Sequence, residues 1–265
     1  MYENRIVAFV DILGTSNAIK ETVNNGVENK GATEDIYNLL KSTQEELNKI
    51  ENYNTTIKNS KITNHFSDSI VISDLVTKES GVLHILVEIL FLCTTALEKN
   101  FFLRGAIVCD QLCHTKDIIF GPALIDAYKK EKDLAIYPRI LIDEKVLDIA
   151  QKYPAKWLSK TERLKIEKKL IAKDFDGLNY INYFDGINYI IGEKDGILTY
   201  LKLLRTAIIN MRKDMHKDIS IKSKYLWLKE KYNTVLTKYK RKYSKENKRL
   251  EFPGLCDYIE NATLF

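Results

Sequence analysis

Short β-prone runs alternate with longer amphipathic patterns along the first half of the chain. Residues 5–12 form an apolar, β-branched and aromatic run, which predicts a buried strand. Apolar residues recur at helical spacing over 32–51, and nearly every position over 81–101 is apolar. The first pattern predicts an amphipathic helix preceded by a loop at 23–32. The second predicts a helix buried against a sheet or against a partner chain.

Further strands are expected around these helices. Two short strands at 60–66 and 70–75 are joined by a tight turn. A strand at 102–109 is expected to reverse in a hairpin near 110–111, and another strand is expected at 137–142.

Capping residues place the helices between these strands. Thr15 or Ser16 can cap a helix after the first strand, Pro122 suits an early helical position, and Asp143 can cap a short helix. The order is therefore βαββαββαβ. Its kernel is a sheet with helices packed on one face, the ferredoxin-like or palm arrangement, so the predicted fold class is α+β.

The second half of the chain is expected to be mostly helical. A basic helical segment covers 155–172, and two strands follow at 177–184 and 187–191. The remaining pattern is helical, with apolar residues on one face of each helix and Lys and Arg on the other. We predict a palm domain at 1–192 and a C-terminal helical extension at 193–265 packed on it.

Composition favours a soluble globular protein, with 45% hydrophobic and 29% charged residues among 265. The net charge of +5 is modest, and the basic run 238–249 is typical of a solvated helix face. Nucleic-acid binding is the alternative for that run, but we expect no direct nucleic-acid partner. Four cysteines without zinc spacing, no signal-peptide pattern and no apolar run long enough for a bilayer predict a cytoplasmic protein.

Two carboxylates stand at the ends of predicted strands. Asp11 closes the apolar run of RIVAFVDILG, and Asp68 lies between the β-prone halves of FSDSIVIS. Two strands that each carry a carboxylate at the tip can place both around one metal cluster, and divalent metals with oxygen ligands suit phosphate chemistry. The alternative is a pair of unrelated turn aspartates.

The motifs FVDILG, FSDSIVIS, FLRGAIV, DIIFGPALIDAYKKE and PRILID occur in an order that resembles the class III nucleotidyl cyclase core. In that family, an F-x-D-I-x-G strand end and a G-D hairpin supply the two metal-binding Asp residues. A strand with L-R-x-G-I and a helix opening on Gly follow. The resemblance covers residues 5–150. It implies that Asp11, Asp68 and the Ile12 carbonyl hold two divalent metal ions, Mn²⁺ or Mg²⁺.

The chain departs from the purine cyclases of that family at several positions. Ser67 replaces the hairpin glycine, Ile125 and Lys129 replace an Asn and an Arg on the helix, and Asn64 replaces a base-reading Lys or Glu. The runs G-P-A-L-x-x-A-Y and Y-P-R-I look most like the bacterial pyrimidine cyclases of the Pycsar anti-phage systems. Those enzymes make cyclic UMP or cyclic CMP, which a separate effector senses.

The resemblance also implies cations for the triphosphate. Arg139 falls where the family places a triphosphate-binding cation, and a bidentate guanidinium suits phosphate oxygens. A salt bridge from Arg139 to Asp143 or Glu144 is the alternative. Lys129 is a candidate replacement for the missing helix Arg, with a plain surface role as its alternative.

Three residues are candidates for contacts to the nucleotide. Asn64 can donate and accept along the Watson–Crick edge of a pyrimidine, although it can equally satisfy a strand edge. Tyr128 can stack on the base or the ribose, or pack as an ordinary core tyrosine. Arg104 is expected to be a buried structural arginine, with a direct substrate contact as the alternative.

These observations together predict a homodimeric cyclase that converts UTP or CTP to the 3′,5′-cyclic monophosphate, with active sites shared between subunits. Asp11, Asp68 and Arg139 are the predicted catalytic residues. Another palm-type cyclase or polymerase is one alternative, although no GGDEF-like hairpin is present. A nucleotide-binding module that has lost catalysis is another, favoured by the missing Asn–Arg pair.

Overall fold

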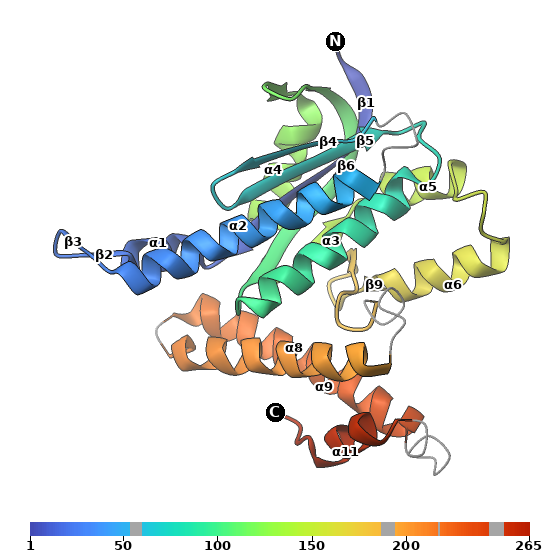
Figure 1. The fold of residues 1–265 in the computed structure, drawn as a ribbon. Coiled ribbons are helices and arrows are strands. Elements are labelled where there is room, and N and C mark those ends of the chain that lie inside the picture. Colours follow the sequence, from blue (N-terminus) through green and yellow to red (C-terminus); the bar gives the residue numbers. More distant parts are fainter. Residues whose placement is uncertain (54–59, 187–193, 217, 244–251) are drawn as a thin grey trace. The chain divides into compact units, whose positions relative to one another are not determined.

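The computed structural model describes residues 1–53, 60–186, 194–216, 218–243 and 252–265. They form two compact units, Met1–Ile181 and Asn182–Phe265, which are described separately. All the described strands lie in the first unit, and the described elements of the second are helices (Figure 1). The predicted domain boundary after residue 192 lies outside the described residues, and it stays a prediction.

The first unit is built on one large sheet with the strand order β4-β5-β1-β6-β8-β10-β9. Neighbouring strands in this order run antiparallel, except that β6 and β8 are parallel. The short strand β7 pairs only with the end of β6. The strands are β1 (Glu3–Leu13), β4 (Ile62–Phe66), β5 (Ser69–Leu75), β6 (Phe102–His114), β7 (Ile119–Phe120), β8 (Ile140–Ile142), β9 (Ile171–Lys173) and β10 (Asn179–Ile181).

Strand β1 lies at the centre of the sheet because its residues are apolar on both faces. Ile6, Val7, Ala8 and Val10 are all fully buried. The neighbouring β6 approaches β1 closely at Gly105, where a Cβ would lie 2.2 Å from the Phe9 carbonyl oxygen. Only glycine allows that approach. The glycine in FLRGAIV therefore has a structural reason in this fold.

Helices cover both faces of this sheet. The long helices α2 (Lys30–Tyr53) and α3 (Gly81–Glu98) pack together on one face, and α4 (Pro122–Asp133) packs on the other (Figure 1). Two shorter helices, α5 (Glu144–Lys152) and α6 (Lys160–Leu170), follow β8. The α+β fold class and the βαββαβ kernel are confirmed. The expectation of helices on one face is wrong, because α4 buries Ala123 and Ala127 against valines of the opposite face.

The predicted hairpin at 110–111 is also wrong. Strand β6 continues through these residues to His114, because Gln111 and Leu112 pair with the start of β1. The chain reverses afterwards, where Thr115 N donates to Ile118 O at 2.8 Å. Asp110 and Gln111 are exposed residues within strand β6 and do not form a turn.

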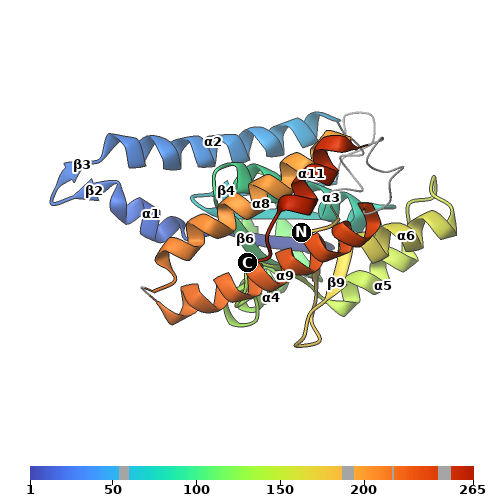
Figure 2. The same cartoon turned by 90° about the horizontal axis from the view of Figure 1, so that it is seen from below.

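The segment after β1 contains more structure than the predicted loop. Helix α1 (Thr15–Glu21) is followed by a small hairpin of β2 (Val23–Asn24) and β3 (Val27–Glu28), with Asn25 and Gly26 at positive φ. Figures 1 and 2 both show this hairpin beyond the end of the sheet, beside the N-terminal end of α2. The prediction that Thr15 or Ser16 caps this helix is wrong, because α1 has no side-chain cap.

The second unit consists of α8 (Lys194–Asp214), α9 (Ile219–Tyr243) and α11 (Pro253–Asn261), which contact one another. Its core contains the predicted apolar faces, among them Leu204 and Ile208 of α8 and Tyr232 of α9. Asp185, which precedes α8, accepts a hydrogen bond from the Tyr239 hydroxyl at 2.8 Å and pairs with Lys238. The helical C-terminal part is confirmed.

Among the described helices, α3 alone has the length and hydropathy of a membrane span, by length and composition only. Sixty-one per cent of this span is buried in the structure. It packs against α2, β1, β5 and β6, as the core helix of a globular domain does. The cytoplasmic location stays a prediction.

Candidate active site

Asp11 and Asp68 lie side by side at one end of the sheet. Asp11 is near the end of β1 and pairs with Ser69, the first residue of β5. Asp68 occupies the turn just before Ser69, and its carbonyl accepts a hydrogen bond from Ile12 N at 3.1 Å. The turn adopts positive φ at Ser67, 54°, so serine takes the left-handed conformation that favours glycine. The structure therefore brings together the three residues predicted to hold metal.

Thr15 ties these groups together. Its hydroxyl lies 2.9 Å from the Ile12 carbonyl oxygen, and it also contacts a carboxylate oxygen of Asp68. Thr15 is the first residue of α1 and is buried. A single hydroxyl thus bridges two of the three oxygen groups that were expected to bind metal. The sequence predicted Thr15 only as a helix cap, and no local pattern indicates these contacts.

The carboxylates form a patch of negative charge that Arg104 compensates only in part. Burial raises the pKa of Asp11 to about 6, and the nearby Asp68 and Glu131 carboxylates add to this rise. The guanidinium of Arg104 acts in the opposite direction on the pKa of Asp11 but does not cancel it. Burial likewise raises the pKa of Glu131. A divalent cation would relieve this repulsion, because it favours the ionised form of each carboxylate.

Arg104 lies beside Asp11, directly across from it on β6. Its Nη2 is 3.6 Å from Asp11 Oδ2, and its Nε is 2.5 Å from the buried Glu131 Oε1 of α4. The Nε–H bond of Arg104 does not point at Glu131 Oε1, so this contact is an ion pair and not a hydrogen bond. The side chain stays 26% exposed. Arg104 is therefore anchored at its base and partly open to solvent next to Asp11.

Arg139 is buried in ion pairs of the first unit, and its predicted contact with a triphosphate stays a prediction. The residue is 1% exposed, and its guanidinium pairs with both Asp174 and Asp176 and lies over the Tyr137 ring. The alternative partner Asp143 pairs with Lys130 instead. Asp174 and Asp176 accept hydrogen bonds from the two terminal nitrogens of Arg139, and these contacts favour a structural role for this arginine.

Asn64 takes part in a hydrogen-bond chain that crosses four strands. Arg5 Nε donates to Ser73 Oγ at 2.8 Å, and Ser73 Oγ lies 2.7 Å from His114 Nδ1. His114 Nε2 contacts Asn64 Oδ1, and Asn64 Nδ2 donates to Lys116 O at 3.0 Å. Both ends of the Asn64 amide are occupied. The chain supports the strand-edge role of Asn64, and its base-reading role stays a prediction.

Burial, with the nearby Arg5 charge, lowers the pKa of His114 to about 4, so the ring is neutral near pH 7. A neutral ring has one donor and one acceptor. Because Asn64 Oδ1 can only accept, the proton is assigned to His114 Nε2, and Nδ1 accepts from the Ser73 hydroxyl. Every hydrogen bond in the chain then has one donor and one acceptor.

Tyr128 and Lys129 both face outward on α4. Tyr128 is 47% exposed, and its ring meets the edge of Phe9 at 5.7 Å between centroids. Lys129 is exposed, and so is Ile125, which stands where the purine cyclases carry asparagine. None of the three is buried in the first unit, so they are available to a partner or a ligand. Their predicted nucleotide contacts stay predictions.

The predicted metal ligands fit hard divalent cations in part. Carboxylate and carbonyl oxygens are the donors that Mg²⁺ prefers, and Mg²⁺ is often held by one or two carboxylates together with substrate phosphates. Within the described residues, no group of three or more His, Cys, Asp or Glu side chains gathers at a distance that would hold a metal ion. Asp11, Asp68 and the Ile12 carbonyl would therefore need phosphate oxygens to complete the coordination.

No family model and no curated protein match this chain. Among solved structures it is similar to the adenylyl cyclase CyaB from P. aeruginosa, at 13% identity over 57% of this chain and 82% of that one, with a TM-score of 0.43. The monomeric guanylyl cyclase domain of the RhoGC fusion protein from the aquatic fungus Blastocladiella emersonii is 14% identical, over 68% of this chain and 94% of that one, with a TM-score of 0.43.

A class III adenylyl cyclase-like ATP-binding protein from Pseudomonas aeruginosa is 9% identical, over 63% of this chain and 40% of that one, with a TM-score of 0.41. All three TM-scores are below 0.5. The function proposed below therefore depends on the geometry and the motifs of this chain.

Proposed function

We propose that this protein is a nucleotide cyclase that converts UTP or CTP to the 3′,5′-cyclic monophosphate and pyrophosphate. The observation that carries the proposal is the placement of Asp11 and Asp68 on adjacent strand ends, joined through Thr15 and the Ile12 carbonyl. Paired carboxylates at one edge of a sheet are suited to phosphoryl transfer that uses divalent cations.

Asp11, Asp68 and the Ile12 carbonyl would hold two divalent ions, Mn²⁺ or Mg²⁺. These ions would lower the pKa of the ribose 3′-hydroxyl and neutralise charge on the triphosphate. The hydroxyl oxygen then attacks the α-phosphorus, and the bond to pyrophosphate breaks. The protein's own part is to hold both carboxylates in place, which Thr15 supports through its contacts to Asp68 and Ile12.

Arg104 is the arginine that we propose for the phosphates, in place of Arg139. It is partly exposed beside Asp11, and Glu131 fixes the base of its guanidinium. A cation placed where charge grows on the α-phosphate and the leaving pyrophosphate stabilises the transition state. Its contact with Asp11 would weaken when a metal ion takes that carboxylate, which would free the guanidinium for phosphate oxygens.

The choice of a pyrimidine rests on motifs. The runs around Gly121 and Pro138 resemble pyrimidine cyclases, and α4 lacks the Asn–Arg pair of the purine enzymes. We propose that Tyr128 and Lys129 contact the nucleotide in a site shared by two subunits of a homodimer. We also propose that the product is a second messenger in anti-phage defence, read by a separate effector.

Incubation of the full chain with each ribonucleoside triphosphate and Mn²⁺, followed by mass spectrometry, tests this proposal. We expect cyclic UMP or cyclic CMP, with little cyclic AMP or cyclic GMP. Asp68→Asn should abolish product, whereas Asp35→Asn, at an exposed position of α2, should not. Binding of a triphosphate without any turnover would favour the catalytically inactive module, and equal turnover of ATP or GTP would refute the pyrimidine assignment.

A further inference from the structure

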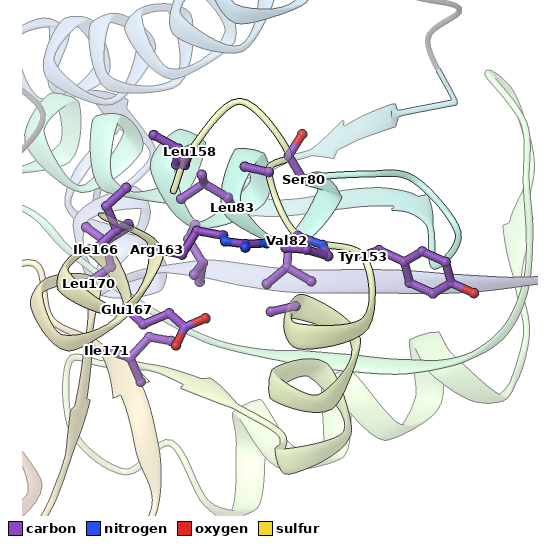
Figure 3. Close-up of a pocket in the computed structure, with 14 residues that line it drawn as sticks. Ser80, Val82, Leu83, Tyr153, Leu158, Arg163, Ile166, Glu167, Leu170 and Ile171 are labelled. Atoms are coloured by element: carbon purple, nitrogen blue, oxygen red, sulfur yellow. The ribbon is translucent and has the colours of Figure 1, made fainter. Parts of the chain in front are cut away.

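A cavity in the first unit lies between α3, α5 and α6 (Figure 3). It is at the N-terminal end of α3, whereas the other end of that helix leads into β6 and the carboxylates. Eighteen residues of α-helix span about 27 Å. The cavity is therefore separate from the candidate active site. Its lining is mostly apolar and consists of Ser80, Val82, Leu83, Leu86, Ala150, Tyr153, Pro154, Ala155, Leu158, Arg163, Ile166, Glu167, Leu170 and Ile171.

Two opposite charges, Arg163 and Glu167, line this otherwise apolar cavity. They are four residues apart on α6, which places them on the same helix face. Figure 3 shows the Arg163 side chain reaching from α6 into the cavity, with Glu167 one turn further along the helix. Neither side chain makes a hydrogen bond or an ion pair with any residue that the structure describes, and they do not pair with each other.

Within the described residues, Arg163 and Glu167 are partly exposed and unpaired, whereas the fully buried charges of this unit are paired or hydrogen-bonded. Lys61 pairs with Glu88, and Arg139 pairs with Asp174. Buried charges are usually paired because their desolvation is costly. An arginine and a glutamate that both face a cavity without partners would gain from a ligand that carries both signs of charge.

The size of the cavity limits the ligand. The cavity volume is about 50 Å³, several times the roughly 10–15 Å³ that one water molecule requires. A small group of several heavy atoms, such as the side chain of an amino acid, is therefore of a suitable size. A nucleoside triphosphate is too large and too anionic for this lining.

We propose that this cavity binds a zwitterionic α-amino acid with an apolar side chain. Arg163 would hold the carboxylate through its planar guanidinium, and Glu167 would hold the ammonium group. The side chain would lie among Leu83, Leu86 and Ile166. Small-molecule sites commonly combine an apolar lining with a few polar groups that fix orientation. This inference does not depend on nucleotide chemistry.

Calorimetric titration of the full chain with leucine, methionine and phenylalanine tests the proposal. Glycine, 4-methylpentanoate and 3-methylbutylamine serve as probes that lack the side chain, the ammonium or the carboxylate. We expect the best of the three amino acids to bind at least about tenfold more tightly than each of these probes. Hydrogen bonds to charged groups contribute about 1.5–3 kcal/mol, so Arg163→Gln should weaken binding roughly 10- to 150-fold.

Glu167→Gln should weaken amino-acid binding but leave 4-methylpentanoate unaffected. Lys168→Gln, at an exposed position of the same helix outside the cavity lining, is the matched control and should bind as the unmodified protein does. Melting temperatures without ligand show whether each variant is folded. The proposal is overturned if none of the three amino acids binds below about 10 mM. It is also overturned if 4-methylpentanoate binds as tightly as leucine, or if folded Arg163→Gln binds normally.

Discussion

Thr15 joins the two halves of the candidate metal site through one hydroxyl, and its substitution tests whether that contact matters. Thr15→Val keeps the shape of the side chain and removes the contacts to Asp68 and to the Ile12 carbonyl. Groups that orient metal ligands commonly contribute 10- to 100-fold to metal affinity or activity. We expect cyclase activity at limiting Mn²⁺ to fall by about that factor, measured as product formed per folded molecule.

Thr15→Ser is the matched control, because it keeps the hydroxyl and loses only a methyl group. It should retain most of the activity and most of the affinity for Mn²⁺. If Thr15→Val has normal activity at limiting Mn²⁺, the bridge has no part in holding the ligands. If Thr15→Ser alone unfolds at a lowered temperature, the methyl group and its packing are what the fold requires.

The raised pKa of Asp11 predicts a pH-dependent cost in the metal-free protein. The pKa of this carboxyl is about 6 in the folded state and about 3.8 in the unfolded chain, so the unfolded state releases its proton first as pH rises. Asp11 therefore lowers the free energy of unfolding progressively between about pH 4 and pH 6. Asp11→Asn removes this cost, by up to about 2 kcal/mol after allowance for partial exposure.

Chemical denaturation with a chelator present, at pH 4.5 and at pH 7.5, measures this difference. Asp11→Asn should gain stability relative to the unmodified protein at the higher pH, with a smaller difference at the lower pH. Asp35→Asn should show no such pH dependence, because it is exposed. A constant difference between Asp11→Asn and the unmodified protein across this range would contradict the charge cluster.

The sequence indicated the two carboxylates but not the ion-pair partners of the arginines. Asp11 and Asp68 could be found because each stands in a recognisable strand-end motif. The partners of Arg139 are Asp174 and Asp176, more than thirty residues downstream, and no local pattern announces them. Glu131, which anchors Arg104, is likewise one of several charged residues at the end of α4. Long-range ion pairs of this kind are decided by the fold and not by the motif.

At the scale of elements, a polar chain fixes the edge of the sheet. Arg5 of β1, Ser73 of β5, His114 of β6 and Asn64 of β4 are linked by successive hydrogen bonds. The chain depends on the continuation of β6 to His114, which places the imidazole beside β4 and β5. Asn64 was predicted to read the base, yet in this structure it closes the polar chain.

Asn64→Ala separates these two roles. The substitution removes the acceptor of the His114 ring proton, and an unsatisfied buried donor costs about 1–3 kcal/mol. We expect the free energy of unfolding to fall by that amount in urea denaturation, with the ratio of UTP to ATP turnover unchanged. Asn38→Ala on α2 is an exposed control. A changed base ratio at unaltered stability would instead support base reading by Asn64.

Predictions at the level of elements succeeded where one signal dominated. The apolar run of β1, the amphipathic spacing of α2 and the Asp143 cap of α5 each identify an element locally. The end of β6 was predicted too early, because Asp110 and Gln111 are polar like turn residues but are exposed residues within the strand. Strand β9 was missed because its three residues follow directly from α6, and pairing with β10 decides their conformation.

At the scale of the whole molecule, the outer face of α4 and the adjacent β7 lack a cover within the first unit. Ile125 is 57% exposed, Tyr128 47% and Phe120 41%. Exposed apolar and aromatic residues next to a polar site are typical of an interface with a partner. A second copy of the chain that covers this face would bring its Tyr128 and Lys129 to the carboxylates of its partner.

A mixing experiment tests this arrangement. Asp68→Asn removes the carboxylate side of each site, and the double variant Tyr128→Ala with Lys129→Ala removes the α4 side. Each variant alone should be inactive as a homodimer. In a heterodimer of the two, one of the two sites contains both intact sides, because a two-fold axis gives each subunit one half of each site. Random exchange makes half of the dimers mixed, so the mixture should recover about a quarter of the activity of the unmodified protein.

Exchange is followed by native mass spectrometry, with subunits of different tag mass. Mixing Asp68→Asn with Asp11→Asn is the control, since both changes affect the carboxylate side and no site is restored. Confirmed exchange without recovered activity would place the complete site within one chain, and normal activity of the α4 double variant alone would show that Tyr128 and Lys129 take no part in the site.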